Sequence, residues 1–210
     1  MPAVLENTTS LVIKDVSWAF YVQTRDEMSD SIQVTFDQGR LEIMSPVSYR
    51  HDDDLSLLTL LLEQFLIARA VGFRKVGGLT LASPLAERAA EPDGSYYIHN
   101  TPPPGGTRNI DLAIHEAPDL IIEVDLSSHS VSKEPVYAAF GVTELWRWEE
   151  DRLTVRRLNE QRTGYDDATE STLLPGLPIN QLAEHVVTGR DRPDNNDTLA
   201  SWKQVVESSR

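Results

Sequence analysis

The sequence contains no cysteine among its 210 residues. Disulfides, thiolate metal sites and cysteine nucleophiles are therefore excluded. No apolar run reaches the roughly 18 residues that a membrane-spanning helix needs, so we expect no membrane crossing. The N-terminal stretch MPAVLENTTS also lacks the basic start and apolar core of a signal peptide. Together these absences predict a cytoplasmic protein.

Positive charge is scarce as well. Lysine and arginine number 19 against 33 aspartates and glutamates, which gives a net charge of −14. Such a balance favours solubility and opposes non-specific binding to polyanions, so it argues against a protein that simply coats nucleic acid. It does not exclude an enzyme that approaches phosphates through a bound metal ion and a local basic patch.

Several familiar catalytic motifs are missing. The sequence has no GxxxxGK[ST] phosphate loop, no GxGxxG turn, no HExxH and no GxSxG. Its five histidines do not have metal-ligand spacing. The chemistry that the sequence can support is therefore carboxylate chemistry.

Length and composition favour one sizeable domain. With 210 residues, 40% of them hydrophobic, the chain suits a single globular unit with short extensions. We expect an N-terminal extension over residues 1–16, which shows no clear pattern, and a domain over 17–187. Residues 188–210 are expected to form a polar linker and a C-terminal helix that docks through Trp202.

The stretch from Pro118 to Asp125, PDLIIEVD, is the centre of this domain. A near-continuous aliphatic run of this kind predicts a strand that is covered on both faces. Leu120, Ile122 and Val124 would project to one face, and Glu123 to the other. An unpaired carboxylate in such a strand costs several kcal/mol, so Glu123 needs a cation, a metal ion or a proton.

The remaining pattern alternates strands and helices. The predicted elements are a short helix capped by Ser17, a hairpin over 32–36 and 41–44, a helix over 52–70, a strand over 73–81 interrupted by Gly77-Gly78, a helix over 132–140, a hairpin over 142–148 and 153–158, one strand over 165–174 and a helix over 181–187.

Four features have two interpretations each at this level. Glu42 lies on the return strand of the first hairpin, and a solvated outer-face residue is the commoner fate of a strand glutamate. His51 is expected to be a capping or surface residue rather than a ligand, since one histidine is a weak signal. Asp93 belongs to a Pro-Asp-Gly turn, or it is an aspartate at the mouth of a strand. The arginines around residues 152–162 form a solvated face or a patch that faces phosphate.

The order of the acidic residues resembles a known nuclease pattern. Pro92-Asp93, then Glu123 in an apolar strand, then Lys133 is similar to the PD-(D/E)xK nuclease superfamily. More closely, the chain resembles the Uma-type family of bacterial restriction endonucleases from about residue 17 to residue 187. The segments that carry the resemblance are GRLEIMSP (39–46), His51, EPDGSYYI (91–98), DLIIEVDLSS (119–128), Lys133 to Tyr137, and GVTELWRW (141–148).

This resemblance implies a fold and an activity. The implied fold is an α/β, restriction-endonuclease-like core: a mixed sheet of four or five strands with helices on both sides, preceded by an N-terminal β-hairpin. The implied activity is hydrolysis of DNA phosphodiester bonds with Mg²⁺ or Mn²⁺. Asp93, Glu123 and the carbonyl of Val124 would hold the ion, and Glu42 resembles the upstream acidic residue of the family. DNA is then the expected partner, and a homodimer is possible.

One residue departs from the superfamily pattern. A lysine is expected two residues after Glu123, but the sequence has Asp125 there. Lys133 could supply the missing cation from the following helix. If it does not, a degenerate nuclease fold that binds or assembles is the alternative. A metal-dependent phosphodiesterase acting on RNA or a nucleotide is the third interpretation.

Overall fold

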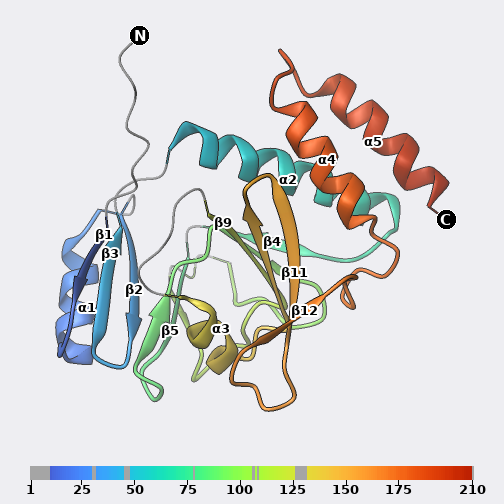
Figure 1. The fold of residues 1–210 in the computed structure, drawn as a ribbon. Helices are drawn as coiled ribbons and strands as arrows, with labels where there is room; N and C mark the ends of the chain where they lie inside the picture. The colour runs from blue at the N-terminus through green and yellow to red at the C-terminus, as the bar shows by residue number, and fades with distance from the viewer. Residues whose placement is uncertain are drawn as a thin grey trace, which may run out of the picture.

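The computed structural model describes residues 10–29, 32–44, 48–77, 79–105, 107, 109–125 and 132–209. Parts of two quoted motifs, residues 45–46 and 126–128, lie outside the described residues. In chain order (Figure 1) the elements are β1 (Ser10–Ile13), α1 (Trp18–Glu27), β2 (Gln33–Asp37), β3 (Arg40–Met44), α2 (Tyr49–Ala68), β4 (Arg74–Val76), β5 (Thr80–Ser83), β6 (Arg88–Ala90), β7 (Gly94–Tyr97), β8 (Asn109–Asp111), β9 (Leu120–Asp125), α3 (Glu134–Phe140), β10 (Glu144–Glu149), β11 (Arg152–Leu158), β12 (Tyr165–Ala168), α4 (Ile179–Gly189) and α5 (Asn196–Ser208).

The strands form two mixed sheets. The main sheet has the order β12-β11-β10-β9-β7-β4, in which β9 and β10 are parallel and the other neighbours antiparallel. The second sheet has the order β1-β3-β2-β6-β5-β8 and contains the predicted N-terminal hairpin, β2–β3. The expected mixed sheet with helices is confirmed, with six strands in each sheet where four or five were expected.

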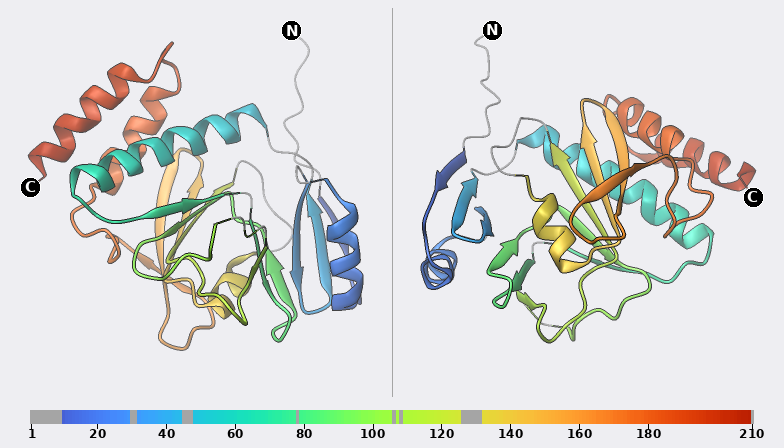
Figure 2. Two further views of the ribbon diagram at one scale, coloured as in Figure 1. Left: turned by 180° about the vertical axis from the view of Figure 1, so that it is seen from behind. Right: turned by 60° about the horizontal axis from the view of Figure 1, so that its bottom comes forward.

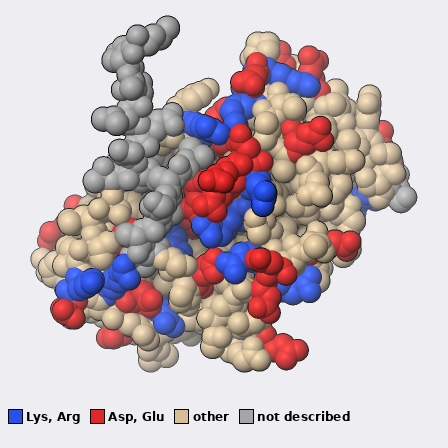
Figure 3. All heavy atoms as spheres, in the orientation of Figure 1, with Lys and Arg blue, Asp and Glu red and all other residues tan. Residues whose placement is uncertain are grey.

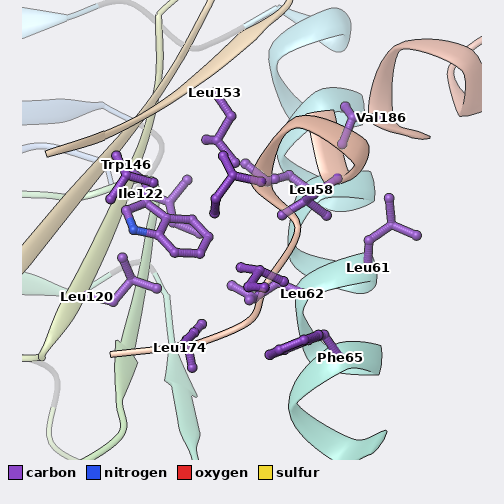
Figure 4. Close-up of a cluster of buried hydrophobic side chains, with 14 of the residues drawn as sticks. Leu58, Leu61, Leu62, Phe65, Leu120, Ile122, Trp146, Leu153, Leu174 and Val186 are labelled. Atoms are coloured by element: carbon purple, nitrogen blue, oxygen red, sulfur yellow. The ribbon is translucent and has the colours of Figure 1, made fainter. Parts of the chain in front are cut away.

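Helices α2 and α4 cover one face of the main sheet, and α5 packs against both of these helices (Figures 1 and 2). Leu120 and Ile122 of β9 belong to the same buried cluster as Leu58 and Leu62 of α2 (Figure 4). Full burial of such a side chain contributes about 1.5–3 kcal/mol, so the apolar residues of this face help to hold β9 in place. Trp202 of α5 is buried in the same cluster, as its docking role predicted.

The other face of β9 packs against α3. Ile121 lies in a second buried cluster with Val136 of α3 and Leu145 of β10. All six residues of β9 are buried, so the strand is covered on both faces as predicted. Because side chains alternate along a strand, Glu123 projects to the α3 side with Ile121. Helix α3 ends at Gly141, whose φ of 79° is the left-handed conformation that glycine adopts at helix ends.

The β2–β3 hairpin has one face that packs on α1 and one polar face toward the rest of the domain. Helix α1 starts after Ser17, whose hydroxyl accepts a hydrogen bond from the N–H of Phe20. Tyr21 of α1 stacks on Phe36 of β2 at a ring distance of 5.2 Å, which seals one face of the hairpin. Gln33 and Glu42 project to the opposite face, since their side chains alternate with those that pack on α1.

Two segments differ from their prediction in the structure. Residues 10–13, expected to be part of an unpatterned extension, form β1 and pair with β3. The strand predicted over 73–81 is two strands, β4 and β5, which belong to different sheets. The break lies directly after β4, at Gly77, and a period of two cannot show which sheet a strand joins.

Two boundaries also moved. The strand predicted over 165–174 ends at Ala168, and the apolar residues that follow, Leu173, Leu174 and Leu177, are buried without forming a strand. Helix α2 begins at Tyr49, earlier than predicted, because the Ser48 hydroxyl caps it by accepting a hydrogen bond from the N–H of His51. None of the helices in the described ranges combines the length and apolar character that a bilayer crossing requires.

Candidate active site

The site forms where β7, β9, β10 and the first turns of α2 and α3 meet. Gly94 of β7 pairs with Ile122 of β9 in antiparallel register, so Asp93, the residue before β7, comes opposite Glu123. Lys133 directly precedes α3 and Tyr137 lies one helical turn later. The spacing of four residues places both on the face of α3 that meets β9. Acidic and basic side chains also gather in the middle of the face shown in Figure 3.

Asp93 is almost completely buried, with 4% of its side chain exposed. Its Oδ1 accepts a hydrogen bond from Nε2 of Gln33 at 2.9 Å, and its Oδ2 accepts one from the backbone N–H of Val124 at 2.8 Å. His51 Nε2 lies 3.1 Å from the same Oδ2. Burial alone would raise the pKa of Asp93, but His51, Lys133 and the Val124 N–H outweigh it and lower the pKa to about 2. Asp93 is therefore ionised, and its hydrogen bonds hold it in place.

Both oxygens of Glu123 are held by α3 and the residue before it. The Lys133 ammonium donates to Oε2 at 2.8 Å, and the Tyr137 hydroxyl donates to Oε1 at 2.5 Å. Burial raises the pKa of Glu123 to about 7; Asp93 adds to the shift, and the two donors oppose it. The carboxylate thus resists ionisation in the absence of further positive charge. A divalent cation at this position would relieve that cost.

Lys133 is fixed by two acceptors. Besides Glu123, its Nζ donates to the backbone carbonyl of Glu91 at 3.1 Å. Burial lowers the pKa of Lys133, but the charges of Glu123 and Asp93 raise it above its usual value. The ammonium therefore stays charged, and it points into the site with 10% of the side chain exposed. Glu91 is itself fixed by Arg25 of α1 at 2.5 Å and by the Thr80 hydroxyl at 3.0 Å.

A pocket of about 140 Å³ opens beside Glu123 and Lys133. Its lining comes from β9, β10 and the start of α3: Glu123, Asp125, Ser132, Lys133, Glu134, Tyr137, Leu145 and Arg147. The carboxylate of Asp125 lies 2.7 Å from Nη2 of Arg147. The residue that replaces the expected lysine is therefore neutralised from the neighbouring strand.

Comparison with known proteins shows the family and the fold. Residues 18–183 match the family Uma2, which is described as "Putative restriction endonuclease". The chain belongs to the Uma2 family. A crystal structure titled as a putative nuclease belonging to DUF820, from Anabaena variabilis ATCC 29413, is similar with a TM-score of 0.53 and 17% identity, covering 89% of this chain and 98% of that chain. At this identity the likeness shows the fold, and the restriction-endonuclease-like core is confirmed. A search of the curated proteins found no match.

The structure of this Uma2 chain brings three of the predicted residues together. Asp93, Glu123 and Lys133 form one buried group, and Val124 joins it through the N–H that binds Asp93. Glu42 is only 1% exposed, so the interpretation as a solvated residue is wrong. Within the described part of the chain no three His, Asp or Glu side chains are arranged to hold a metal ion, and the role of Glu42 as a ligand stays a prediction.

Sequence reasoning missed several residues of the site. His51 was expected at a cap or on the surface, but it is buried against Asp93. Gln33 had no distinguishing signal, because its contact with Asp93 joins residues 60 positions apart. Tyr137 had a usable signal: it lies four residues after Lys133 in a quoted motif, on the same helix face.

The arginines around residues 152–162 do not form a phosphate-facing patch at this pocket. Arg156 forms ion pairs with Glu134 and Asp167. Arg152, Arg157 and Arg162 are exposed and are not among the residues that line the pocket. The arginine that does line it, Arg147, was not singled out from the sequence.

Proposed function

We propose that this protein is a metal-dependent endonuclease that hydrolyses DNA phosphodiester bonds. The observation that carries the proposal is the Lys133 ammonium, 2.8 Å from Glu123, in a buried site where Asp93 faces the same carboxylate. An acidic pair can hold the metal ion of a phosphodiester hydrolase, and an adjacent lysine can stabilise the charge that develops on the phosphate. The family supports nuclease chemistry in general terms; the metal and the DNA substrate belong to the proposal.

The donor set fits Mg²⁺ or Mn²⁺. Both carboxylates offer hard oxygen donors, and Mg²⁺ is commonly held by one or two carboxylates with water and substrate phosphate completing its shell. Each carboxylate oxygen has two lone pairs, so Glu123 can hold an ion while it still accepts from Lys133 and Tyr137. Asp93 and Glu123 are the ligands we assign, with the Val124 carbonyl and Glu42 as further candidates. Such an ion, when bound, would lower the pKa of a bound water and neutralise negative charge on the phosphate oxygens.

The chain's own residues would act around that chemistry. Lys133 stabilises the negative charge that develops on the phosphate, or orients the attacking water, because its ammonium is fixed and charged. Tyr137 and His51 act as positioning residues, since each donates to one of the two carboxylates. The covered strand β9 keeps this group rigid, which electrostatic stabilisation requires.

Two observations favour a second function. Asp125 stands in place of the expected lysine, and the overall charge of −14 opposes contact with polyanions. Both fit a nuclease fold that binds a metal ion or a partner without cutting. Cleavage distinguishes this relic from an active enzyme.

The experiment is cleavage of supercoiled plasmid DNA with Mn²⁺ or Mg²⁺, measured for wild type, Glu123→Gln and Lys133→Ala. We expect nicked and linear products from the wild type, and none after chelation of the metal. Lys133→Ala should lower turnover far more than metal or DNA affinity, and Lys133→Arg should rescue it poorly because a planar fork does not replace a compact ammonium. A wild type that binds Mn²⁺ and leaves the plasmid intact would show the relic; parallel assays on RNA test the phosphodiesterase alternative.

A further inference from the structure

The starting point is the buried carboxylate of Asp125. It stands two residues after Glu123 in β9, on the same face of the strand, and only 6% of the residue is exposed. A buried carboxylate requires a positive partner. Arg147 of β10 supplies it, donating from Nε at 3.1 Å and from Nη2 at 2.7 Å to Oδ2 of Asp125.

Strand register brings Arg147 to the reaction group. In the parallel pair of β9 and β10, Arg147 is directly opposite Glu123. Its chain neighbours Trp146 and Trp148 are fully buried in the cluster on the α2 side. Arg147 therefore projects to the α3 side, where it lines the same pocket as Glu123, Lys133 and Tyr137.

The guanidinium of Arg147 has more N–H groups than its hydrogen bonds to Asp125 use. It carries five N–H groups, and the two hydrogen bonds to Asp125 come from one of its edges. The contacts of Nη1 with Glu134, 3.6 Å, and of Nη2 with Glu149, 3.7 Å, are too long for hydrogen bonds. Since 32% of the side chain is exposed at the pocket, a ligand can reach the free N–H groups.

We propose that Arg147 binds a non-bridging phosphate oxygen of the nucleic-acid strand in this pocket, as a second cation besides Lys133. The proposal rests on the proposed nuclease function and adds a substrate contact to it. Arginine suits this task because its planar fork can hold one carboxylate with one edge and a phosphate with another. Asp125 holds the fork in place, which reduces the ordering cost of binding.

The charge of the pocket sets a condition on this contact. Its lining carries three carboxylates, Glu123, Asp125 and Glu134, against the two cations Lys133 and Arg147. Asp93, the second carboxylate that we assign to the metal ion, is ionised as well, so four negative charges stand against two positive ones and oppose a phosphate. A divalent cation balances this excess. We therefore expect Arg147 to contribute to DNA affinity only when a divalent cation is present.

The test is the affinity for a short fluorescein-labelled DNA duplex, measured by anisotropy over a range of salt concentrations in millimolar Ca²⁺, with wild type, Arg147→Gln and Arg156→Gln. Arg156 is the matched control because it is also a partly buried arginine paired with Glu134, but it does not line the pocket. Arg147→Gln should weaken binding about five- to tenfold and reduce the slope of log affinity against log salt by about 1, as loss of one phosphate contact does. Arg156→Gln should stay within about twofold of wild type.

A second pair of variants controls for the loss of stability that Arg147→Gln can cause. Arg147→Gln leaves Asp125 buried without its arginine, which destabilises the fold. The double change Asp125→Asn with Arg147→Gln removes both charges, and it is compared with Asp125→Asn alone, which keeps the arginine. The double variant should again bind about five- to tenfold more weakly than the single one.

Each outcome of the binding measurement either supports or overturns the inference. If wild type binds the duplex and Arg147→Gln binds equally well, or if both arginine variants weaken it alike, Arg147 is only the counter-ion of Asp125 and the inference is overturned. If wild type itself does not bind the duplex in the presence of the divalent ion, the proposed function fails and this contact fails with it. Only a selective loss at Arg147 supports the inference.

Discussion

Replacing Tyr137 by phenylalanine removes one hydroxyl from the wall of the site and keeps the ring that packs there. The hydroxyl is buried and donates to Oε1 of Glu123 at 2.5 Å. Burial and the charge of Glu123 raise the pKa of Tyr137, so the group remains a donor at any working pH. The change thus tests how strongly the buried carboxylate depends on its donors.

A hydrogen bond to a charged group contributes about 1.5–3 kcal/mol to the free energy of unfolding, against about 0.5–1.5 kcal/mol for a neutral one. For a chain of this size, 1 kcal/mol shifts the melting temperature by about 2–4 °C. Tyr137→Phe should therefore lower the melting temperature by about 3–12 °C when Glu123 is ionised. The folded pKa of Glu123, about 7, lies above its ordinary value of 4.5.

The raised pKa of Glu123 determines how the effect of Tyr137→Phe changes with pH. The contribution of Glu123 to stability is fully present below the unfolded pKa and is lost as pH rises through the folded pKa. Well above 7 the carboxylate is charged and depends most on the tyrosine hydroxyl. The loss caused by Tyr137→Phe should therefore be larger at about pH 8.5 than at about pH 5, where Glu123 is protonated in the folded state.

Tyr165→Phe is the matched control. Tyr165 is also buried, but its hydroxyl donates to the neutral backbone carbonyl of Val142 at 3.0 Å. Thermal melts followed by circular dichroism in the presence of a chelator compare the two variants. Equal losses for both tyrosines, or a loss for Tyr137→Phe that does not grow with pH, would refute the reasoning about Glu123.

Three further results are expected. Mn²⁺ should raise the melting temperature of wild type, and Asp93→Asn or Glu123→Gln should abolish the rise; equal stabilisation of all three proteins would contradict a shared site. Glu42→Gln should weaken Mn²⁺ binding in calorimetry with the fold intact, whereas unchanged binding would remove Glu42 from the ligand set. Asp54→Ala should lower the free energy of unfolding by about 1–3 kcal/mol in urea titration, because it leaves the buried indole N–H of Trp148 without its acceptor, and a loss under about 0.5 kcal/mol would count against that.

The parts of the fold that the sequence predicted well are governed by local periodicity. The aliphatic run of β9 and the long apolar stripe of α2 each specify their element without outside information. The division of residues 73–81 between two sheets could not be predicted in this way. Sheet membership depends on distant partners, such as the pairing of β5 with β6 and β8.

The residues of the candidate site divide in the same way, into those that a sequence pattern links and those that only the fold brings together. Asp93, Glu123 and Lys133 could be selected because a family pattern links them along the chain. Arg147 could not, since its importance comes from strand register and from the unusual carboxylate of Asp125 beside it. His51 looked like a capping residue for a related reason. The local sequence shows that a helix begins near His51, but it cannot show that Asp93 lies next to the imidazole ring.

The central claim is that Asp93 and Glu123 share one divalent ion next to the Lys133 ammonium. Anomalous diffraction from crystals soaked in Mn²⁺ tests it most directly, because the signal locates the ion independently of activity. The account predicts an anomalous peak within coordination distance of a carboxylate oxygen from both Asp93 and Glu123. Soaked crystals with no peak between these two side chains, or with manganese bound only elsewhere, would contradict it.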